Sequence, residues 1–181
     1  MSNTKTSKDA KIGAKLKWKT GLVAFMDILG YRSLAQLRIE RIVEEIVASV
    51  TETPKLAQAC YKDAVQDISG RHNSKGSATK LVSSFKTMVL SDSIIISCPC
   101  PFSEKDPCIA VEFYRTSALF ISYCRALVAL LMRRNLLVRG AITYGKYCRR
   151  DNTLAGIPLI EAYELSEEID AACLVLTPTL E

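Results

Sequence analysis

Two apolar runs, each interrupted by one carboxylate, dominate the hydrophobic pattern of this chain. The first is Leu-Val-Ala-Phe-Met-Asp-Ile-Leu-Gly at residues 22–30, with Asp27 inside it, and the second spans residues 87–97 around Asp92. A continuous apolar run of this length predicts a buried strand, where an unpartnered carboxylate is costly. We therefore expect both acids at strand ends, facing cations. Paired carboxylates suit hard divalent cations, although either acid alone would more often be a turn residue or a helix N-cap.

The remaining pattern predicts further strands and helices. The first half is predicted to contain a strand from Gly21 to Asp27, a helix burying Ile39, Ile42, Val43, Ile46 and Val50, a second helix from Pro54 burying Leu56, Cys60, Ala64 and Ile68, and a loop from Gly70 to Thr79. Next come a hairpin of Leu81–Leu90 and Ser93–Cys98 turning at Ser91–Asp92, a loop at 98–107, a helix to about Asn135, a strand at Leu136–Tyr144, a helix at Gly156–Glu168 and a strand at Cys173–Leu176. This order predicts an α/β (α+β) sandwich whose mostly antiparallel sheet carries helices on one face.

Charge separates one end of the chain from the rest. The net charge of the 181 residues is +5, and the six lysines and single acid of residues 1–20 account for all of it. We expect a mobile basic arm at residues 1–20 and one domain at residues 21–181. Because the folded part is then formally neutral, the sequence argues against a nucleic-acid partner.

No membrane span is predicted, because the most apolar helix candidate, 110–132, contains Glu112, Arg115 and Arg125. The N-terminus lacks the apolar core of a secretory signal. The seven cysteines form no CxxC pair and the one histidine, His72, lies in a polar stretch, which disfavours zinc binding and histidine-based catalysis. Reduced thiols and the absence of targeting signals predict a cytoplasmic protein.

Three short motifs follow one another along the chain. They are Phe-Met-Asp-Ile-Leu-Gly-Tyr at residues 25–31, Ser91-Asp92 at the predicted hairpin tip, and Arg-Gly-Ala-Ile-Thr-Tyr-Gly at residues 139–145. In this order they resemble the motifs of the class III nucleotidyl cyclases, over roughly residues 20–177. The resemblance implies a ferredoxin-like sheet, two divalent cations (Mn²⁺ or Mg²⁺) and a homodimer whose sites are shared between subunits.

Four positions depart from the purine cyclases of that family. The base-reading Lys or Glu is replaced by Met88, and Ile157, Ile160 and Glu164 stand where the helix motif has Asp, Asn and Arg. The whole pattern is similar to the pyrimidine cyclases of the Pycsar antiphage systems, which make cyclic UMP or cyclic CMP when phage infects. The resemblance implies a uridylate or cytidylate cyclase, a phosphorus-oxygen lyase that uses UTP ahead of CTP and activates a downstream effector.

The resemblance also implies roles for the residues around the first acid. Asp27, Asp92 and the backbone carbonyl of Ile28 are the implied metal ligands. The turn from Leu29 through Gly30 to Tyr31 is expected to offer free amides to phosphate, and Tyr31 is also a candidate for the base pocket.

Three further residues are candidates with open alternatives. Arg139 is the expected phosphate clamp, reaching from one subunit to the phosphates bound by the other, or else it forms a structural ion pair. Arg32 contacts phosphate or is solvated at the helix start. Met88 lines the base pocket or packs in the core.

Two other functional readings remain open. A catalytically dead cyclase homologue acting as a binding or partner module agrees with Ile160 and Glu164. A ferredoxin-like RNA-binding domain would need exposed aromatic residues on neighbouring strands, where this sequence has Ile, Val, Leu and Ser, and it is disfavoured.

Overall fold

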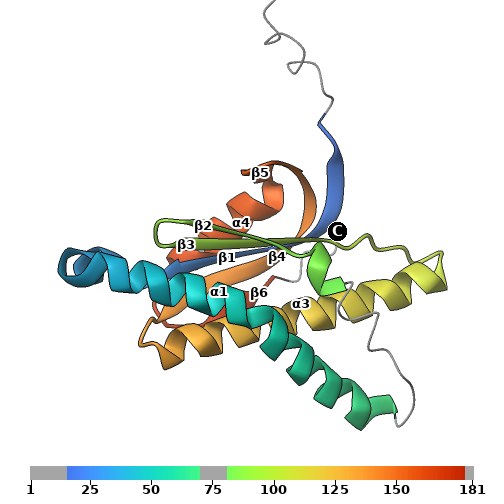
Figure 1. The fold of residues 1–181 in the computed structure, drawn as a ribbon. Coiled ribbons are helices and arrows are strands. Elements are labelled where there is room, and N and C mark those ends of the chain that lie inside the picture. The colour runs from blue at the N-terminus through green and yellow to red at the C-terminus, as the bar shows by residue number, and fades with distance from the viewer. Residues whose placement is uncertain (1–15, 70–80, 178–181) are drawn as a thin grey trace, which may run out of the picture.

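A single six-stranded sheet forms the centre of the fold (Figure 1). The computed structural model describes residues 16–69 and 81–177, with the backbone alone for 62–69. The predicted arm up to residue 15 and the predicted loop at 70–79 lie outside this range. The strands are β1 (Trp18–Ile28), β2 (Lys86–Leu90), β3 (Ser93–Pro99), β4 (Val138–Arg150), β5 (Thr153–Gly156) and β6 (Leu174–Leu176). They are arranged in the order β2-β3-β1-β4-β5, and β6 pairs with β4. All pairings are antiparallel except that of β6, which confirms the mixed α/β class and the mostly antiparallel sheet.

Helices cover both faces of this sheet, whereas the sequence predicted helices on one face. The helices α1 (Tyr31–Ser69) and α3 (Pro107–Arg133) pack over alternate β1 residues such as Leu22 and Met26. The helix α4 (Ile157–Glu168) packs on the opposite face, over Val23 and Phe25. Figure 1 shows α4 above the sheet and the other two helices below it. The reason is that β1 is apolar on both faces, as expected of a central strand that is buried on both sides.

The helix α1 differs from the prediction in two respects. It continues through Pro54 as one element, whereas a second helix was predicted to begin there, and its backbone leaves helical geometry at Arg38 (φ −156°, ψ 54°). Two residues predicted to be buried, Ile39 and Val43, are 44% exposed, and Cys60 is exposed as well. Some apolar residues at helical spacing on α1 therefore lie outside the surface that the rest of the chain covers.

The predicted strands are present with changed ends. Residues 81–84 form a helical turn and β2 begins only at Lys86, because Phe85 is held by its amide donating to the Val82 carbonyl and by edge contacts of its ring with Phe120 and Tyr123. Strand β4 passes through Gly145, where a Cβ would lie only 3.3 Å from the ring of Pro158 in α4. The strand then continues into a hairpin with β5 that the sequence did not predict.

The helix α3 begins at a well-formed N-cap. The Asp106 side chain accepts hydrogen bonds from the amides of Cys108 and Ile109, and Pro107 occupies the first turn. By length and mean hydropathy (1.3) α3 would also be able to cross a membrane, but half of its most apolar stretch is buried in the protein. Its packing against α1 is that of a core helix.

Candidate active site

The two aspartates that interrupt the apolar runs meet at one end of the sheet. Asp27 lies at the end of β1 and pairs in register with Ser93, the first residue of β3. Asp92 forms the hairpin tip just before it, following Ser91 in a left-handed conformation (φ 57°). The Ile28 amide donates to the Asp92 carbonyl over 3.0 Å. This backbone bond holds the two residues side by side.

The surroundings of Asp27 disfavour a bare negative charge. Its side chain is 22% exposed, and burial raises its pKa above the ordinary value of 3.8, helped by the charge of Asp92. The Arg139 guanidinium opposes this rise, but it does not cancel it. A pair of repelling carboxylates is relieved by a divalent cation, so the donor chemistry fits the predicted metal. Within residues 16–69 and 81–177 no three His, Cys, Asp or Glu side chains gather, which leaves two carboxylates and a backbone carbonyl as donors.

Arg139 is the cation of this site. It is the direct partner of Asp27 in the β1–β4 ladder, with its Nε 3.5 Å from an Asp27 carboxylate oxygen. One terminal nitrogen donates to Glu167 over 2.6 Å and the other to the Ile169 carbonyl over 3.4 Å. The buried Nε has no well-directed hydrogen bond, so its 3.5 Å contact with Asp27 is a long ion pair.

This position corrects one sequence-based expectation. Arg139 was expected to serve the site of the partner subunit, but it lies beside Asp27 of its own chain. The structure also adds Glu167, which no sequence motif had marked. Because Glu167 lies 28 positions after Arg139, on α4, only the fold brings these two residues together.

The turn after β1 is only partly open to a ligand. The Leu29 amide, which was expected to be free, donates to the Leu137 carbonyl over 2.9 Å. Gly30 adopts a left-handed conformation (φ 70°), and a Cβ there would meet nothing within 4 Å. Arg32 is exposed on the first turn of α1. The turn thus offers open space at Gly30 and a solvent-facing arginine, but the first of its three predicted amides is already used.

The two candidates for the base pocket lie on different faces of the sheet. Met88 pairs with Ile95, which in turn pairs with Phe25, and all three belong to the apolar cluster beneath α4. Asp27 is two residues from Phe25 and shares this face. Tyr31 instead packs against the cluster beneath α1 and α3. A base near Asp27 would therefore meet Met88 and not the Tyr31 ring.

The helix α4 supplies an aromatic residue that the sequence had not marked. The Tyr163 ring packs edge-on against Phe25, with 5.4 Å between ring centroids, and Tyr163 remains half exposed. The residues that replace the family's polar positions are exposed on the same helix, Ile157 at 68% and Ile160 at 56%, while Glu164 is exposed too. Ile157 and Ile160 therefore expose apolar surface on this helix, and Glu164 exposes a carboxylate.

No protein-family model matches the sequence, and no curated protein sequence matches it either. Among solved structures, the fold is similar to the adenylyl cyclase CyaB from P. aeruginosa, with a TM-score of 0.55 at 15% identity over 91% of this chain and 80% of CyaB. The chain therefore has a fold similar to that of a class III nucleotidyl cyclase.

Two other solved structures overlap with this chain more weakly. One is the catalytic core of a rhodopsin-guanylyl cyclase with converted specificity in complex with ATPalphaS, at a TM-score of 0.46 and 12% identity over 90% of this chain and 79% of that core. The other is a class III adenylyl cyclase-like ATP-binding protein from Pseudomonas aeruginosa, at 0.44 and 12% over 91% of this chain. This chain spans only 34% of the length of that ATP-binding protein.

Proposed function

We propose that this protein is a nucleotide cyclase that converts a pyrimidine triphosphate, UTP ahead of CTP, to the 3′,5′-cyclic nucleotide and pyrophosphate. The observation that carries the proposal is the meeting of Asp27 and Asp92 at one end of a cyclase-like sheet, where the charge of Asp92 helps to raise the pKa of Asp27. The pairing supports a site for two divalent cations, Mn²⁺ or Mg²⁺, held by these carboxylates and by the Ile28 carbonyl.

In the proposed reaction the ribose 3′ oxygen forms a bond to the α-phosphorus, the α–β phosphoanhydride bond breaks, and the hydroxyl proton leaves to solvent. The cations, when bound, would lower the pKa of the 3′ hydroxyl and neutralise the phosphates. We assign phosphate binding beside Asp27 to Arg139, because its fork-shaped guanidinium is permanently charged. The open space at Gly30 admits the phosphates to the turn.

The pyrimidine preference rests on the sequence resemblance and on Met88. Met88 is half-buried on the edge strand β2, at the end of a row that continues through Ile95 and Phe25, which are buried in the core. Its thioether offers no directed donor, so contact of a base with Met88 discriminates by size and shape. The half-exposed Tyr163 beside Phe25 is positioned to pack against a bound base.

Incubation of the protein with the four nucleoside triphosphates and Mn²⁺, followed by mass spectrometry of the products, tests this proposal. We expect cyclic UMP as the main product, cyclic CMP second, and pyrophosphate in equal amount. Asp27→Asn and Asp92→Asn proteins should form none. Equal cyclisation of ATP or GTP would exclude the pyrimidine preference.

The biological setting follows from the Pycsar resemblance. We infer a cytoplasmic homodimer that makes its cyclic nucleotide in response to phage and acts through a cyclic-nucleotide-activated effector, without a nucleic-acid or membrane partner. The exposed Ile157 and Ile160 of α4 support a second copy of the chain on that face. Sedimentation of the purified protein, alone and as an Ile160→Glu variant, tests the dimer.

One observation favours a second candidate function. Arg139 is already engaged by Asp27 and Glu167, and Ile160 replaces a polar family residue, as in a catalytically dead homologue acting as a binding module. That function predicts nucleotide binding by calorimetry without cyclic product from any triphosphate, with Mn²⁺ present and the oligomer intact.

A further inference from the structure

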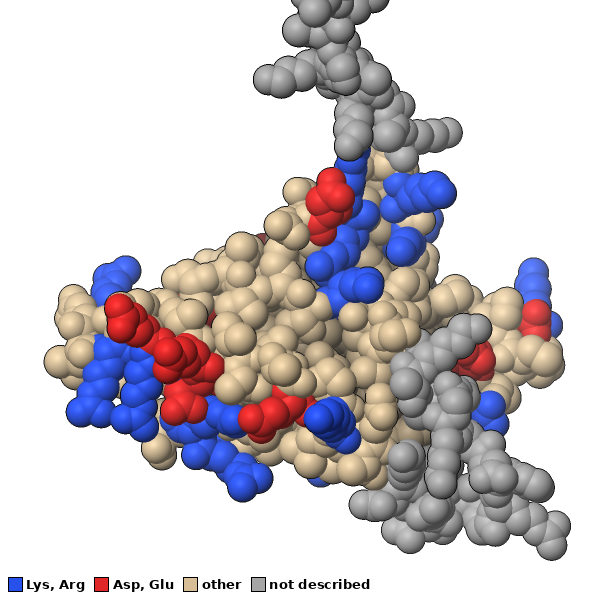
Figure 2. All heavy atoms as spheres, viewed as in Figure 1, with Lys and Arg blue, Asp and Glu red and all other residues tan. Residues whose placement is uncertain are grey.

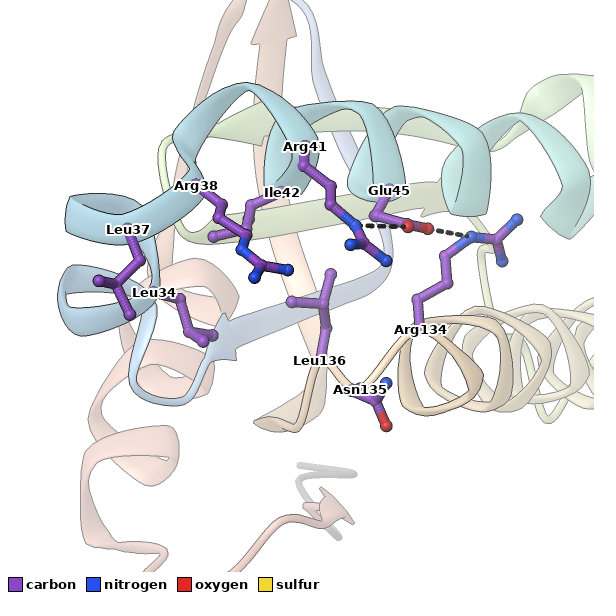
Figure 3. Close-up of a pocket in the computed structure, with 9 residues that line it drawn as sticks. All are labelled: Leu34, Leu37, Arg38, Arg41, Ile42, Glu45, Arg134, Asn135 and Leu136. Atoms are coloured by element: carbon purple, nitrogen blue, oxygen red, sulfur yellow. Dashed lines mark ion pairs between the residues drawn. The ribbon is translucent and has the colours of Figure 1, made fainter.

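A cavity of about 320 Å³ lies between α1 and the segment that joins α3 to β4, away from the sheet face that carries Asp27 (Figure 3). Its wall is apolar at Leu34, Leu37, Ile42 and Leu136. Ligand pockets for small molecules start at about 300 Å³, so this cavity has room for one small ring or a short chain with its head group.

Arginines surround this apolar wall. Arg38 and Arg41 extend from α1 toward the space above Leu136, as Figure 3 shows. Arg134, on the other side of the cavity, is held by Glu45 at 2.9 Å and by Glu52 at 2.7 Å. The two α1 arginines are less well paired. Arg41 meets Glu45 only at 3.7 Å, and no carboxylate in the described part of the chain lies within ion-pair distance of Arg38.

The backbone supports a role for Arg38 beyond a solvated charge. The helix α1 leaves helical geometry at this residue, which is neither proline nor glycine. Interruptions of this kind have specific causes and recur at functional sites. Here the interruption lies at the cavity, beside Leu37, whose side chain is 80% exposed at the cavity rim. The helix therefore gives up regular geometry where it presents a cation to an apolar hollow.

We propose that this cavity, which we call the arginine pocket, is a binding site for a small amphiphilic anion, a compact apolar group carrying one carboxylate or phosphate. The apolar part contacts Leu34, Ile42 and Leu136, and the head group accepts charge-assisted hydrogen bonds from Arg38 and Arg41. The arginine pocket is separate from the candidate active site, and this proposal does not depend on the proposed function.

Titration of the full chain with four probes, followed by calorimetry and by NMR, tests the proposal. The probes are phenyl phosphate, benzoate, the neutral benzyl alcohol and inorganic phosphate. We expect the two aromatic anions to bind more tightly than the alcohol and than inorganic phosphate, and the tighter of the two identifies the preferred head group. Raised salt should weaken the binding of both anions.

Variants locate the binding. Arg38→Gln and Arg41→Gln should each lower the affinity for the aromatic anions by about tenfold, as expected for loss of a charge-assisted hydrogen bond. Leu37→Glu, at an exposed position that tolerates the change, should abolish binding without altering the circular dichroism spectrum. Two controls should bind as the wild type does: Arg125→Gln, an exposed arginine of α3 outside the arginine pocket, and Arg139→Gln in the candidate active site.

Four results would overturn the proposal. In the first two, benzyl alcohol or inorganic phosphate binds as tightly as the aromatic anions. In the third, the Arg38→Gln and Arg41→Gln proteins both bind those anions as tightly as the wild type does. Loss of binding in Arg139→Gln would place the anion in the candidate active site and would equally exclude the arginine pocket.

Discussion

Asp27 and Arg139 are direct neighbours across the β1–β4 ladder, with the Arg139 Nε 3.5 Å from an Asp27 carboxylate oxygen. Both side chains are about four-fifths buried, so solvent screens this contact less than it screens an ordinary surface ion pair. The carboxylate proposed to hold metal and the arginine proposed to hold phosphate thus come from one chain. This relationship decides how the two residues should behave in mixed dimers.

Mixing Asp27→Ala chains with Arg139→Ala chains should give no recovery of cyclase activity. Because both residues belong to the same site, each site of a mixed dimer carries one lesion. Activity would be measured after subunit exchange has been demonstrated with differently tagged chains. Recovery to about a quarter of wild-type activity, as random pairing with one intact site per mixed dimer gives, would show that the two residues serve different sites.

Removing either aspartate should not lower stability in the absence of metal. Asp92→Asn removes a charge that raises the pKa of Asp27, so the melting temperature should stay unchanged or rise. Asp27→Asn removes a carboxylate whose raised pKa means that its ionised form costs stability at neutral pH, so its melting temperature should also stay unchanged or rise. Thermal unfolding of both variants at pH 7 without metal is the measurement. A melting temperature below that of the wild type for either variant would contradict this account.

The pKa shift of Asp27 has a defined pH signature. Its pKa is raised in the folded protein, so the folded state holds that proton more tightly than the unfolded chain does. Stability from this group is therefore present below about pH 3.8 and is lost as the pH rises through the raised pKa. Denaturant unfolding without metal, measured from about pH 3.8 upward, should show a smaller loss of unfolding free energy for Asp27→Asn than for the wild type.

Cysteine labelling tests the packing of the sheet. Cys60, Cys108 and Cys173 are exposed, whereas Cys98, Cys100, Cys124 and Cys148 are buried. Burial also raises the pKa of the Cys98 thiol to about 12, which keeps it in its unreactive protonated form. Brief treatment with iodoacetamide at pH 8 should modify only the three exposed cysteines, as read by mass spectrometry, and all seven in denaturant. Rapid native labelling of Cys98 would contradict the fold.

The sequence predicted the elements whose signals are local. The apolar runs around Asp27 and Asp92 gave β1, β3 and the hairpin tip, because a run ended by turn residues needs no distant information. The burial of α1 was predicted less well: Ile39 and Val43 have helical spacing, but which apolar face is covered depends on α3. Glu167 carried no signal, since its contact with Arg139 exists only once α4 is folded back on the sheet.

Glu167 is expected to compete with phosphate for Arg139. In the present structure it holds one terminal nitrogen of Arg139 over 2.6 Å, while its own side chain is half exposed. Glu167→Gln should free the guanidinium for the triphosphate and lower the KM for nucleotide by about two- to fivefold, since an ion pair of this exposure contributes up to about 1 kcal/mol.

The neighbouring Glu168 provides the matched control, because it is exposed on the same helix turn and the structure gives it no ion pair within the described residues. Glu168→Gln changes the net charge equally and should leave the KM unchanged. If long-range electrostatics alone were responsible, the KM values of both variants would fall together. The measurement is the initial rate against UTP concentration for both variants at two salt concentrations. A raised KM in Glu167→Gln would show instead that Glu167 positions Arg139 for phosphate, because the arginine would then need its carboxylate partner to reach the substrate.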